Sequence, residues 1–97
     1  MAKLAIVATI KTTAGKRDEY LKALRAHAER CLATEPGTLR FDILVPQAEA
    51  DTVMLFEVYA SKEAFDTHWN GESMKQIRSE AAGLQVSLKG VRCDLME

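Results

Sequence analysis

Apolar residues recur along this chain with two different periods, and the change between them predicts the first elements. Residues 3–12 carry apolar side chains on both faces of an extended segment, as a covered strand does. From Lys16 the apolar residues recur at steps of three and four, which is one stripe of an amphipathic helix. Pro36-Gly37 ends this helix, because proline cannot continue it and disfavours helical geometry at Glu35. The stripe contains Tyr20, Leu21, Leu24, Ala28, Cys31 and Leu32.

Two further strands are predicted after the first helix. Residues 38–45 alternate, with apolar Leu39 and Phe41 set against Arg40 and Asp42. Residues 52–59 are apolar on nearly all positions of both faces, and a polar connection joins the two segments. Together these residues predict a hairpin of two antiparallel strands.

The remaining chain predicts a broken helix and a last strand. Ser61 is a suitable N-cap for a helix over residues 62–69. Asn70-Gly71 is a turn signal, after which we expect the helix to resume over residues 72–82. Gly83 marks the end of that helix, and residues 86–95 form a fourth strand interrupted by Gly90.

The predicted order, β-α-β-β-α-β, is that of an α+β fold. Its natural arrangement is a ferredoxin-like antiparallel sheet with the helices on one face, formed by a single domain over residues 1–97. The second face of this sheet carries too many apolar residues to remain in water. We therefore expect a homodimer that packs sheet against sheet.

Composition narrows the classes of function. The 97 residues are 47% hydrophobic and 28% charged, with a formal net charge of −1, so no basic surface for nucleic acid is expected. No apolar run is long enough to span a membrane and no signal-type leader is recognised, so a cytoplasmic location is the expectation. Cys31 and Cys93 are far apart and lack metal-site spacing; we expect inert, free thiols.

Three segments resemble one family. Residues 35–42 (EPGTLRFD) are similar to the helix end and second strand of the antibiotic biosynthesis monooxygenase (ABM) superfamily. Residues 55–59 (LFEVY) and 61–68 (SKEAFDTH) resemble its third strand and second helix, including the family's usual histidine. The resemblance implies paired subunits in a dimeric α+β barrel, with a pocket in each protomer between sheet and helices. The family includes quinol monooxygenases without a cofactor, heme-degrading enzymes and an isomerase of a phosphorylated signal.

No cofactor is expected for this chain. The heme-degrading relatives carry an asparagine on the first strand and a heme-binding histidine late in the second helix. This sequence has Thr9 and residues 75–79 (KQIRS) in those places. No G-x-G-x-x-G or P-loop pattern is present either.

The candidate catalytic residues are His68 and Glu57. An unperturbed imidazole titrates at about pH 6.5, so His68 can take and return a proton, although it can equally be a packed histidine. Glu57 shares a strand face with apolar residues, where an unpaired carboxylate is costly to bury. It either pairs with Arg40 as a structural contact or orients His68 or a substrate hydroxyl. His27 has no acidic neighbour at useful spacing and is interpreted as structural, and no metal site is expected.

Five residues are candidate substrate-binding groups. Trp69 either forms an aromatic wall or covers the core at a helix end. The aromatic ring of Phe41 could position a substrate ring, and Arg40 or Tyr59 could hold an anionic oxygen. Arg78 is a weaker candidate that is more typical of a surface position.

The leading functional prediction is a small monooxygenase that oxidises an electron-rich phenolic or quinol compound with dioxygen and without a cofactor. Two alternatives stay open. One is an isomerase or degradative enzyme for a small phosphorylated signal molecule, with Arg40 and Arg78 as phosphate ligands. The other is a non-enzymatic dimer that binds an apolar metabolite. In each case the partner is a small molecule, with no nucleic acid or membrane.

Overall fold

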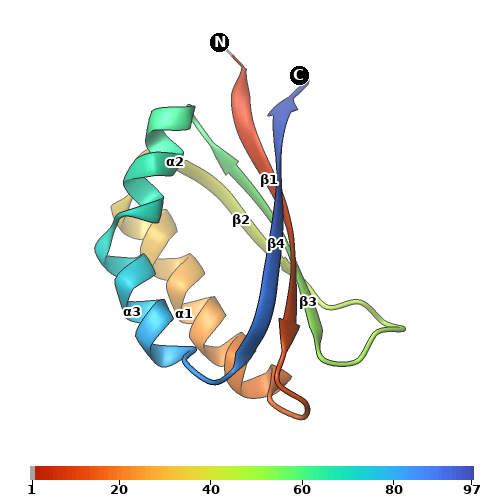
Figure 1. The fold of residues 1–97 in the computed structure, drawn as a ribbon. Helices are drawn as coiled ribbons and strands as arrows, with labels where there is room; N and C mark the ends of the chain where they lie inside the picture. Colours follow the sequence, from red (N-terminus) through yellow and green to blue (C-terminus); the bar gives the residue numbers. More distant parts are fainter. Residues whose placement is uncertain (1) are drawn as a thin grey trace.

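A computed structural model describes residues 2–97. Figure 1 shows one sheet with all helices on one side of it. The strands are β1 (Lys3–Thr12), β2 (Thr38–Leu44), β3 (Thr52–Tyr59) and β4 (Gln85–Leu95), and the helices are α1 (Arg17–Thr34), α2 (Lys62–Trp69) and α3 (Glu72–Glu80). The predicted ferredoxin-like α+β fold is confirmed, with the second helix divided in two.

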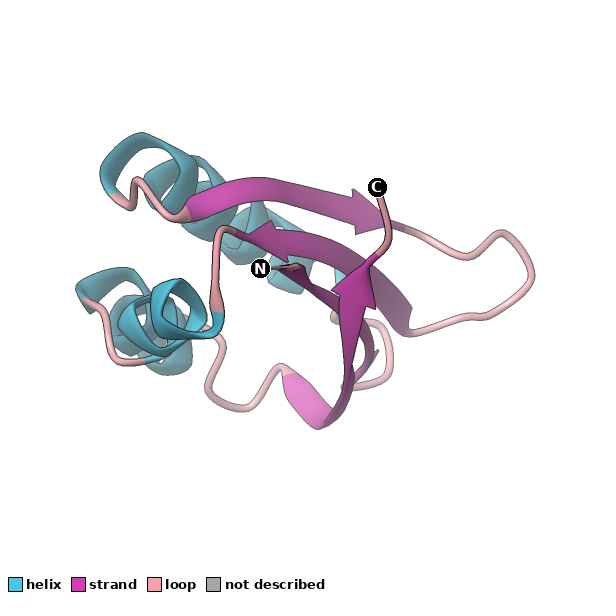
Figure 2. Ribbon diagram, turned by 90° about the horizontal axis from the view of Figure 1, so that it is seen from above, coloured by secondary structure: helices cyan, strands magenta, loops and turns pink. Residues whose placement is uncertain are grey.

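The strands form one antiparallel sheet in the order β2-β3-β1-β4. Seen from above in Figure 2, the sheet is strongly curved, and the helices lie together on one side. On the helix-facing side Ile10 and Val53 are cross-strand partners, and both side chains are fully buried. Ile6 pairs with Glu57 on the same face, so a carboxylate enters an otherwise apolar layer. Successive residues of a strand alternate between faces, which fixes what the outer face carries.

The outer face is mostly apolar at its centre and charged along β2. Val7 pairs with Phe56 on one side and with Val91 on the other, and Val7 and Val91 are 38% and 51% exposed. At the β2 edge, Arg40 Nε donates a hydrogen bond of 2.6 Å to Asp42 Oδ2. The prediction of apolar residues on both sheet faces therefore holds for the central strands.

The break in the second helix lies where the turn signal predicted it. Ser61 Oγ accepts a 3.1 Å hydrogen bond from the Ala64 amide, which caps the start of α2. The helix stops at Trp69, and α3 begins after Gly71. Helix α3 ends at Glu80, two residues before the predicted end, because the chain turns toward Gly83, whose φ is +80°.

One expectation about the last strand is wrong. β4 is not interrupted at Gly90, which pairs in register with Ala8 of β1. Backbone hydrogen bonds maintain the ladder without a side chain, so a single glycine does not end the strand. No helix among residues 2–97 is both long and apolar enough to cross a membrane.

Candidate functional site

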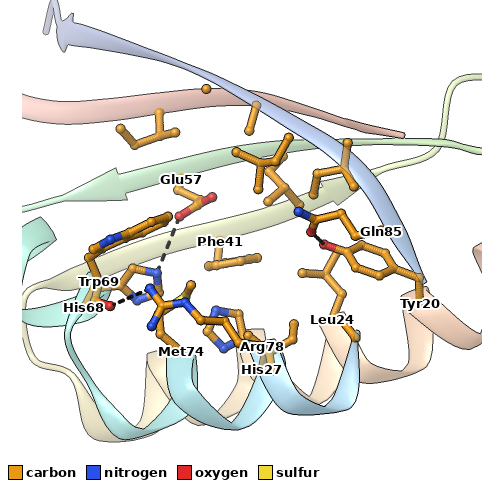
Figure 3. Close-up of a pocket in the computed structure, with 18 of the residues that line it drawn as sticks. Tyr20, Leu24, His27, Phe41, Glu57, His68, Trp69, Met74, Arg78 and Gln85 are labelled. Carbon is orange, nitrogen blue, oxygen red and sulfur yellow. Dashed lines mark hydrogen bonds and ion pairs between the residues drawn. The ribbon is translucent and has the colours of Figure 1, made fainter. Parts of the chain in front are cut away.

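A cavity of about 700 Å³ lies between the sheet and the helices. This volume is within the range of roughly 300–1,000 Å³ of small-molecule sites. Its lining is mostly apolar, comes from all four strands and all three helices, and contains a few polar groups. Figure 3 shows His68 and Trp69 at one end and Tyr20 and Gln85 at the other. Tyr20 Oη donates a 3.0 Å hydrogen bond to Gln85 Oε1, which joins α1 to the start of β4.

His68 is the buried residue of α2, with 3% of its surface exposed. Since α2 begins at the Ser61 cap, residue 68 lies one turn beyond Phe65 and Ala64, which pack against the core. The imidazole is surrounded by aromatic rings, with the Tyr59 centroid at 5.1 Å and the Phe41 centroid at 6.4 Å. The imidazole of His68 is thus buried among aromatic rings at the wall of the cavity.

A carboxylate that the sequence interpretation did not include holds His68 in place. Glu35 ends α1, and the following proline favours the extended backbone that it adopts. His68 Nδ1 is 2.8 Å from Glu35 Oε1, which also accepts a 2.7 Å hydrogen bond from Thr38 Oγ1. Burial would raise the pKa of Glu35, but the hydrogen bonds from Thr38 and His68 outweigh it and lower this pKa.

The Glu35 contact decides which nitrogen of His68 can act as a base. An ionised carboxylate only accepts hydrogen bonds, so His68 Nδ1 carries a proton and donates it to Glu35. In the neutral ring the lone pair is then on Nε2. This nitrogen lies 4.0 Å from Oε1 of Glu57, along the dashed line in Figure 3.

Glu57 is the second carboxylate of the site. Tyr59 Oη donates a hydrogen bond to Oε1 of Glu57. Burial raises the pKa of Glu57, and the hydrogen bond from Tyr59 and the nearby His68 offset that effect only in part. Burial beside this carboxyl also raises the pKa of Tyr59. Glu57 therefore takes up a proton more readily than an exposed glutamate, whereas Glu35 keeps its charge.

His27 of α1 lies beneath the same cavity. Its ring centroid is 5.4 Å from that of His68, and its Nδ1 is hydrogen-bonded to Ser73 Oγ at 2.8 Å. Arg30 Nε donates to the same hydroxyl at 2.9 Å. Burial, with the charges of His68 and Arg30, lowers the pKa of His27 to about 4. His27 is thus neutral near pH 7 and ties α1 to α3.

Three possible metal-ligating residues meet at this point. One ligand atom from each of His27, Cys31 and His68 lies within 4.8 Å of the others. Cys31 Sγ is 3.6 Å and 3.7 Å from the two ring nitrogens of His27, so it is nearly equidistant from them and does not lie along the lone pair of either nitrogen. Burial raises the pKa of the Cys31 thiol to about 12. The side chains would have to rotate, and the thiol to ionise, before they shared an ion.

Aromatic and cationic side chains border the cavity beside His68. Phe65 and Trp69, one turn apart on α2, are stacked with centroids 5.9 Å apart. The guanidinium of Arg78, on α3, lies 5.0 Å from the Trp69 centroid. Arg92, on β4, lies 4.9 Å from the Phe65 centroid. Trp69 remains 44% exposed, so its ring faces both solvent and cavity.

The cavity brings together most of the predicted site residues. Those that line it are His68, Glu57, Trp69, Phe41 and Arg78.

Arg40 and Tyr59 are placed differently. Arg40 is on the outer face of the sheet, where it lies 5.4 Å from the Phe56 centroid and pairs with Asp42. Its predicted pairing with Glu57 is therefore wrong, because Glu57 points to the helix side. Tyr59 is fully buried and contacts the site through Glu57.

Sequence reasoning missed Glu35, Arg92 and the position of His27 in the cavity wall. A signal existed for Glu35, since a carboxylate directly before a helix-ending proline is held in extended backbone. For Arg92 the signal was its position two residues after Gly90 on the last strand. Residues two apart share a face of the sheet, and both line the cavity on the helix side. For His27 it was the position four residues before Cys31 on the apolar stripe.

The fold and cavity define a class: a ferredoxin-like domain with a small-molecule pocket between sheet and helices. The sequence profile of the antibiotic biosynthesis monooxygenase (ABM) family matches residues 4–80, and the chain belongs to this family. No curated protein matches the chain.

Solved structures named for the same family share the fold. A protein from Caulobacter crescentus CB15 is 24% identical, with a TM-score of 0.91 over 99% of this chain and 92% of its own. A protein from Nitrosomonas europaea is 22% identical, with a TM-score of 0.91 over 98% of this chain and 91% of its own. A Chloroflexus aurantiacus protein is 18% identical, with a TM-score of 0.87 over 99% and 95% of the two chains.

Proposed function

We propose that this protein is a monooxygenase that oxidises an electron-rich phenolic or quinol compound with dioxygen, using no cofactor. The observation that carries the proposal is a buried histidine held by Glu35 at the wall of a mostly apolar cavity of about 700 Å³. Membership of the ABM family supports the oxidative reaction class.

The proposed reaction begins with removal of the phenolic proton. Nε2 of His68 accepts this proton, because Nδ1 is occupied by Glu35. The resulting phenolate is a stronger electron donor than the phenol and reduces dioxygen directly. For a hydroquinone, one molecule of substrate and one of dioxygen give one hydroxyquinone and one water. The substrate supplies all the electrons, so the balance closes without a further reductant.

The surrounding side chains support this step. Phe41 and Trp69 line the cavity and offer ring faces for a planar substrate. Glu57 faces Nε2 and stabilises the imidazolium that forms, while Tyr59 holds Glu57 in place. The apolar lining excludes water, which strengthens the electrostatic interactions around the developing charge.

Oxygen uptake tests the proposal. Purified protein, shown to be free of flavin and heme by its absorbance, is supplied with a panel of hydroquinones in an oxygen electrode. We expect uptake above the autoxidation rate that falls by roughly 100-fold or more in His68→Ala. Arg25→Gln, an exposed change on α1, is the control and should retain full activity. Uptake that is equal in wild type and His68→Ala contradicts the assignment of the base.

A second candidate is an isomerase or degradative enzyme for a small phosphorylated molecule. The observation in its favour is that Arg78 lines the cavity that holds His68 and Glu57. A histidine and a carboxyl of raised pKa can pass protons between carbon and oxygen atoms of such a substrate. Conversion of a phosphorylated sugar without oxygen uptake would favour this candidate over the monooxygenase.

We also propose that two copies pair through the outer faces of their sheets. Val7, Phe56 and Val91 form an apolar centre there, and large apolar patches on soluble proteins mark interfaces. Sedimentation at micromolar concentration should give a dimer for the wild type and a monomer for Val7→Glu. A monomeric wild type contradicts the pairing. It does not affect the oxygen-uptake test of His68.

A further inference from the structure

Four planar side chains form a continuous stack along one border of the cavity. The order is Arg78, Trp69, Phe65 and Arg92, with centre-to-centre distances of 5.0 Å, 5.9 Å and 4.9 Å. The aromatic pair comes from α2, and the two cations come from α3 and β4. All four residues line the cavity, so a cationic group stands at each end of this aromatic border.

Neither of these guanidinium groups is neutralised by a carboxylate. Among residues 2–97, the arginines with ion pairs are Arg30, which pairs with Glu80, and Arg40, which pairs with Asp42. Arg78 donates one hydrogen bond, of 3.1 Å, to the backbone oxygen of Trp69. That contact holds the Arg78 side chain at the cavity wall, and its other N–H donors have no side-chain partner among residues 2–97. Figure 3 labels Arg78 among the residues that line the cavity.

The cationic groups of the cavity lie at its aromatic border, apart from the buried carboxylate of Glu57. The acidic residues of the lining are Glu57 and Asp66. Glu57 is buried on the sheet side of the cavity, where it accepts a hydrogen bond from Tyr59 and lies 4.0 Å from Nε2 of His68. His27 is neutral near pH 7 because burial lowers its pKa to about 4. Asp66 is exposed on α2 and is the one acidic group of the lining at the solvent side.

Arg92 and His68 are close enough to hold two ends of one small molecule. The Arg92 guanidinium is 4.9 Å from the Phe65 centroid, which is 6.2 Å from the His68 centroid. The sum of these distances is an upper limit for the separation of guanidinium and imidazole. An aromatic compound of one or two rings with an acidic substituent spans it.

We propose that the substrate carries an anionic group, a carboxylate or a phosphate, which one of the two arginines, Arg78 or Arg92, binds at its own end of the aromatic border while the phenolic ring reaches His68. Guanidinium groups match the planar geometry of carboxylate and phosphate oxygens. The aromatic pair between the arginines provides the surface on which the substrate ring enters. The phenolic ring of this substrate rests on the proposed function. The acidic substituent is an addition to that proposal.

Equilibrium binding without oxygen tests the acidic end separately from catalysis. Naphthol, naphthoate and naphthyl phosphate share one ring system and differ in the charged substituent. Their affinities are measured by calorimetry under nitrogen for wild type, Arg78→Gln, Arg92→Gln and the double variant. We expect at least one of the two anions to bind wild type about tenfold or more tightly than naphthol. The double variant should lose that advantage and keep its affinity for naphthol.

Controls keep the outcomes distinct. Arg25→Gln removes one exposed positive charge outside the cavity and should leave all three affinities unchanged. In wild type the advantage of the anions should also shrink between about 0.01 M and about 0.15 M salt, which needs no variant to fold. Comparison of naphthoate with naphthyl phosphate shows which anion fits better.

Equal affinity of all three compounds for wild type overturns the inference, as does an anion advantage that survives in the double variant. Either result leaves the oxygen-uptake test of His68 untouched. Conversely, an anion advantage without oxygen uptake would support the acidic end and contradict the oxidation.

Discussion

Acid should destabilise the protein through His27. In the folded protein, burial with the charges of His68 and Arg30 lowers the pKa of His27 from 6.5 to about 4. The unfolded chain binds this proton below about pH 6.5, while the folded protein resists it until about pH 4. The contribution of His27 to the free energy of unfolding is therefore complete above pH 6.5 and is lost as the pH falls toward 4.

The size of the effect follows from the two pKa values. They differ by about 2.5, and each pKa unit corresponds to about 1.36 kcal/mol, so the free energy of unfolding should fall by about 3 kcal/mol. This is a large fraction of the roughly 5–15 kcal/mol that stabilises a typical domain. In His27→Gln the amide can still meet the Ser73 hydroxyl, but nothing titrates at this position.

Urea denaturation between pH 7.5 and 4, followed by circular dichroism, measures the difference. The wild type should lose about 3 kcal/mol more than His27→Gln over this interval. Lys22→Gln, an exposed change on the same helix, should follow the wild type. Nuclear magnetic resonance should in addition show one of the two histidines titrating near pH 4. Parallel stability curves for wild type and His27→Gln, or two histidines that titrate above pH 6, would contradict the role given to His27.

Substitutions at Glu35, at the contact of Gly37 with Ala64, and at Ser61 test the site and the elements that hold it. Glu35→Ala should lower oxidation by roughly tenfold or more and shift the His68 tautomer seen in nitrogen NMR, whereas Glu35→Gln, which can still accept from Nδ1, should do so less. Gly37→Ala should cost about 1–3 kcal/mol in urea denaturation, because its Cβ would lie 2.5 Å from that of Ala64. The double variant Gly37→Ala with Ala64→Gly should lose less stability than the sum of the losses in the two single variants. Ser61→Ala should cost about 1 kcal/mol by removing the α2 cap.

Each of these expectations has a contradicting result. An unchanged tautomer in Glu35→Ala would mean that this carboxylate does not position the ring. Additive effects at positions 37 and 64 would mean that the two Cβ atoms are not in conflict. For the cap, Ser79→Ala is the matched control, because Ser79 is exposed on α3. Equal losses in Ser61→Ala and Ser79→Ala would contradict the capping role.

The strands could be predicted well because their signal is local. β1 and β3 have the predicted bounds, since both are apolar on nearly every position and end at polar turns. β4 was predicted to break at Gly90 because glycine has weak strand propensity, yet pairing with β1 on one side maintains it. Strand propensity describes an isolated segment. In the folded protein, the backbone hydrogen bonds to β1 decide whether β4 continues through Gly90.

Only those site residues were predictable whose direction follows from the apolar period of their own helix or strand. The pattern of α2 directs His68 inward, and the pattern of β3 places Glu57 on the helix side. Adjacent residues of a strand face opposite sides, so Phe41 and Arg40 could not both enter one cavity, and this rule was sufficient to exclude Arg40. The contact between Glu35 and His68 joins residues 33 positions apart, and no local pattern encodes such a pairing.

The destination of the two oxygen atoms of dioxygen is the sharpest test of the proposed monooxygenase reaction. Wild-type protein is supplied with isotopically labelled dioxygen and an oxidisable hydroquinone, and the product is trapped at once because quinone oxygens exchange with water. One labelled oxygen atom should appear in the product and the other in water, and the rate of product formation should fall by roughly 100-fold or more in His68→Ala. Unlabelled product, or hydrogen peroxide formed at the same rate with and without His68, would contradict it.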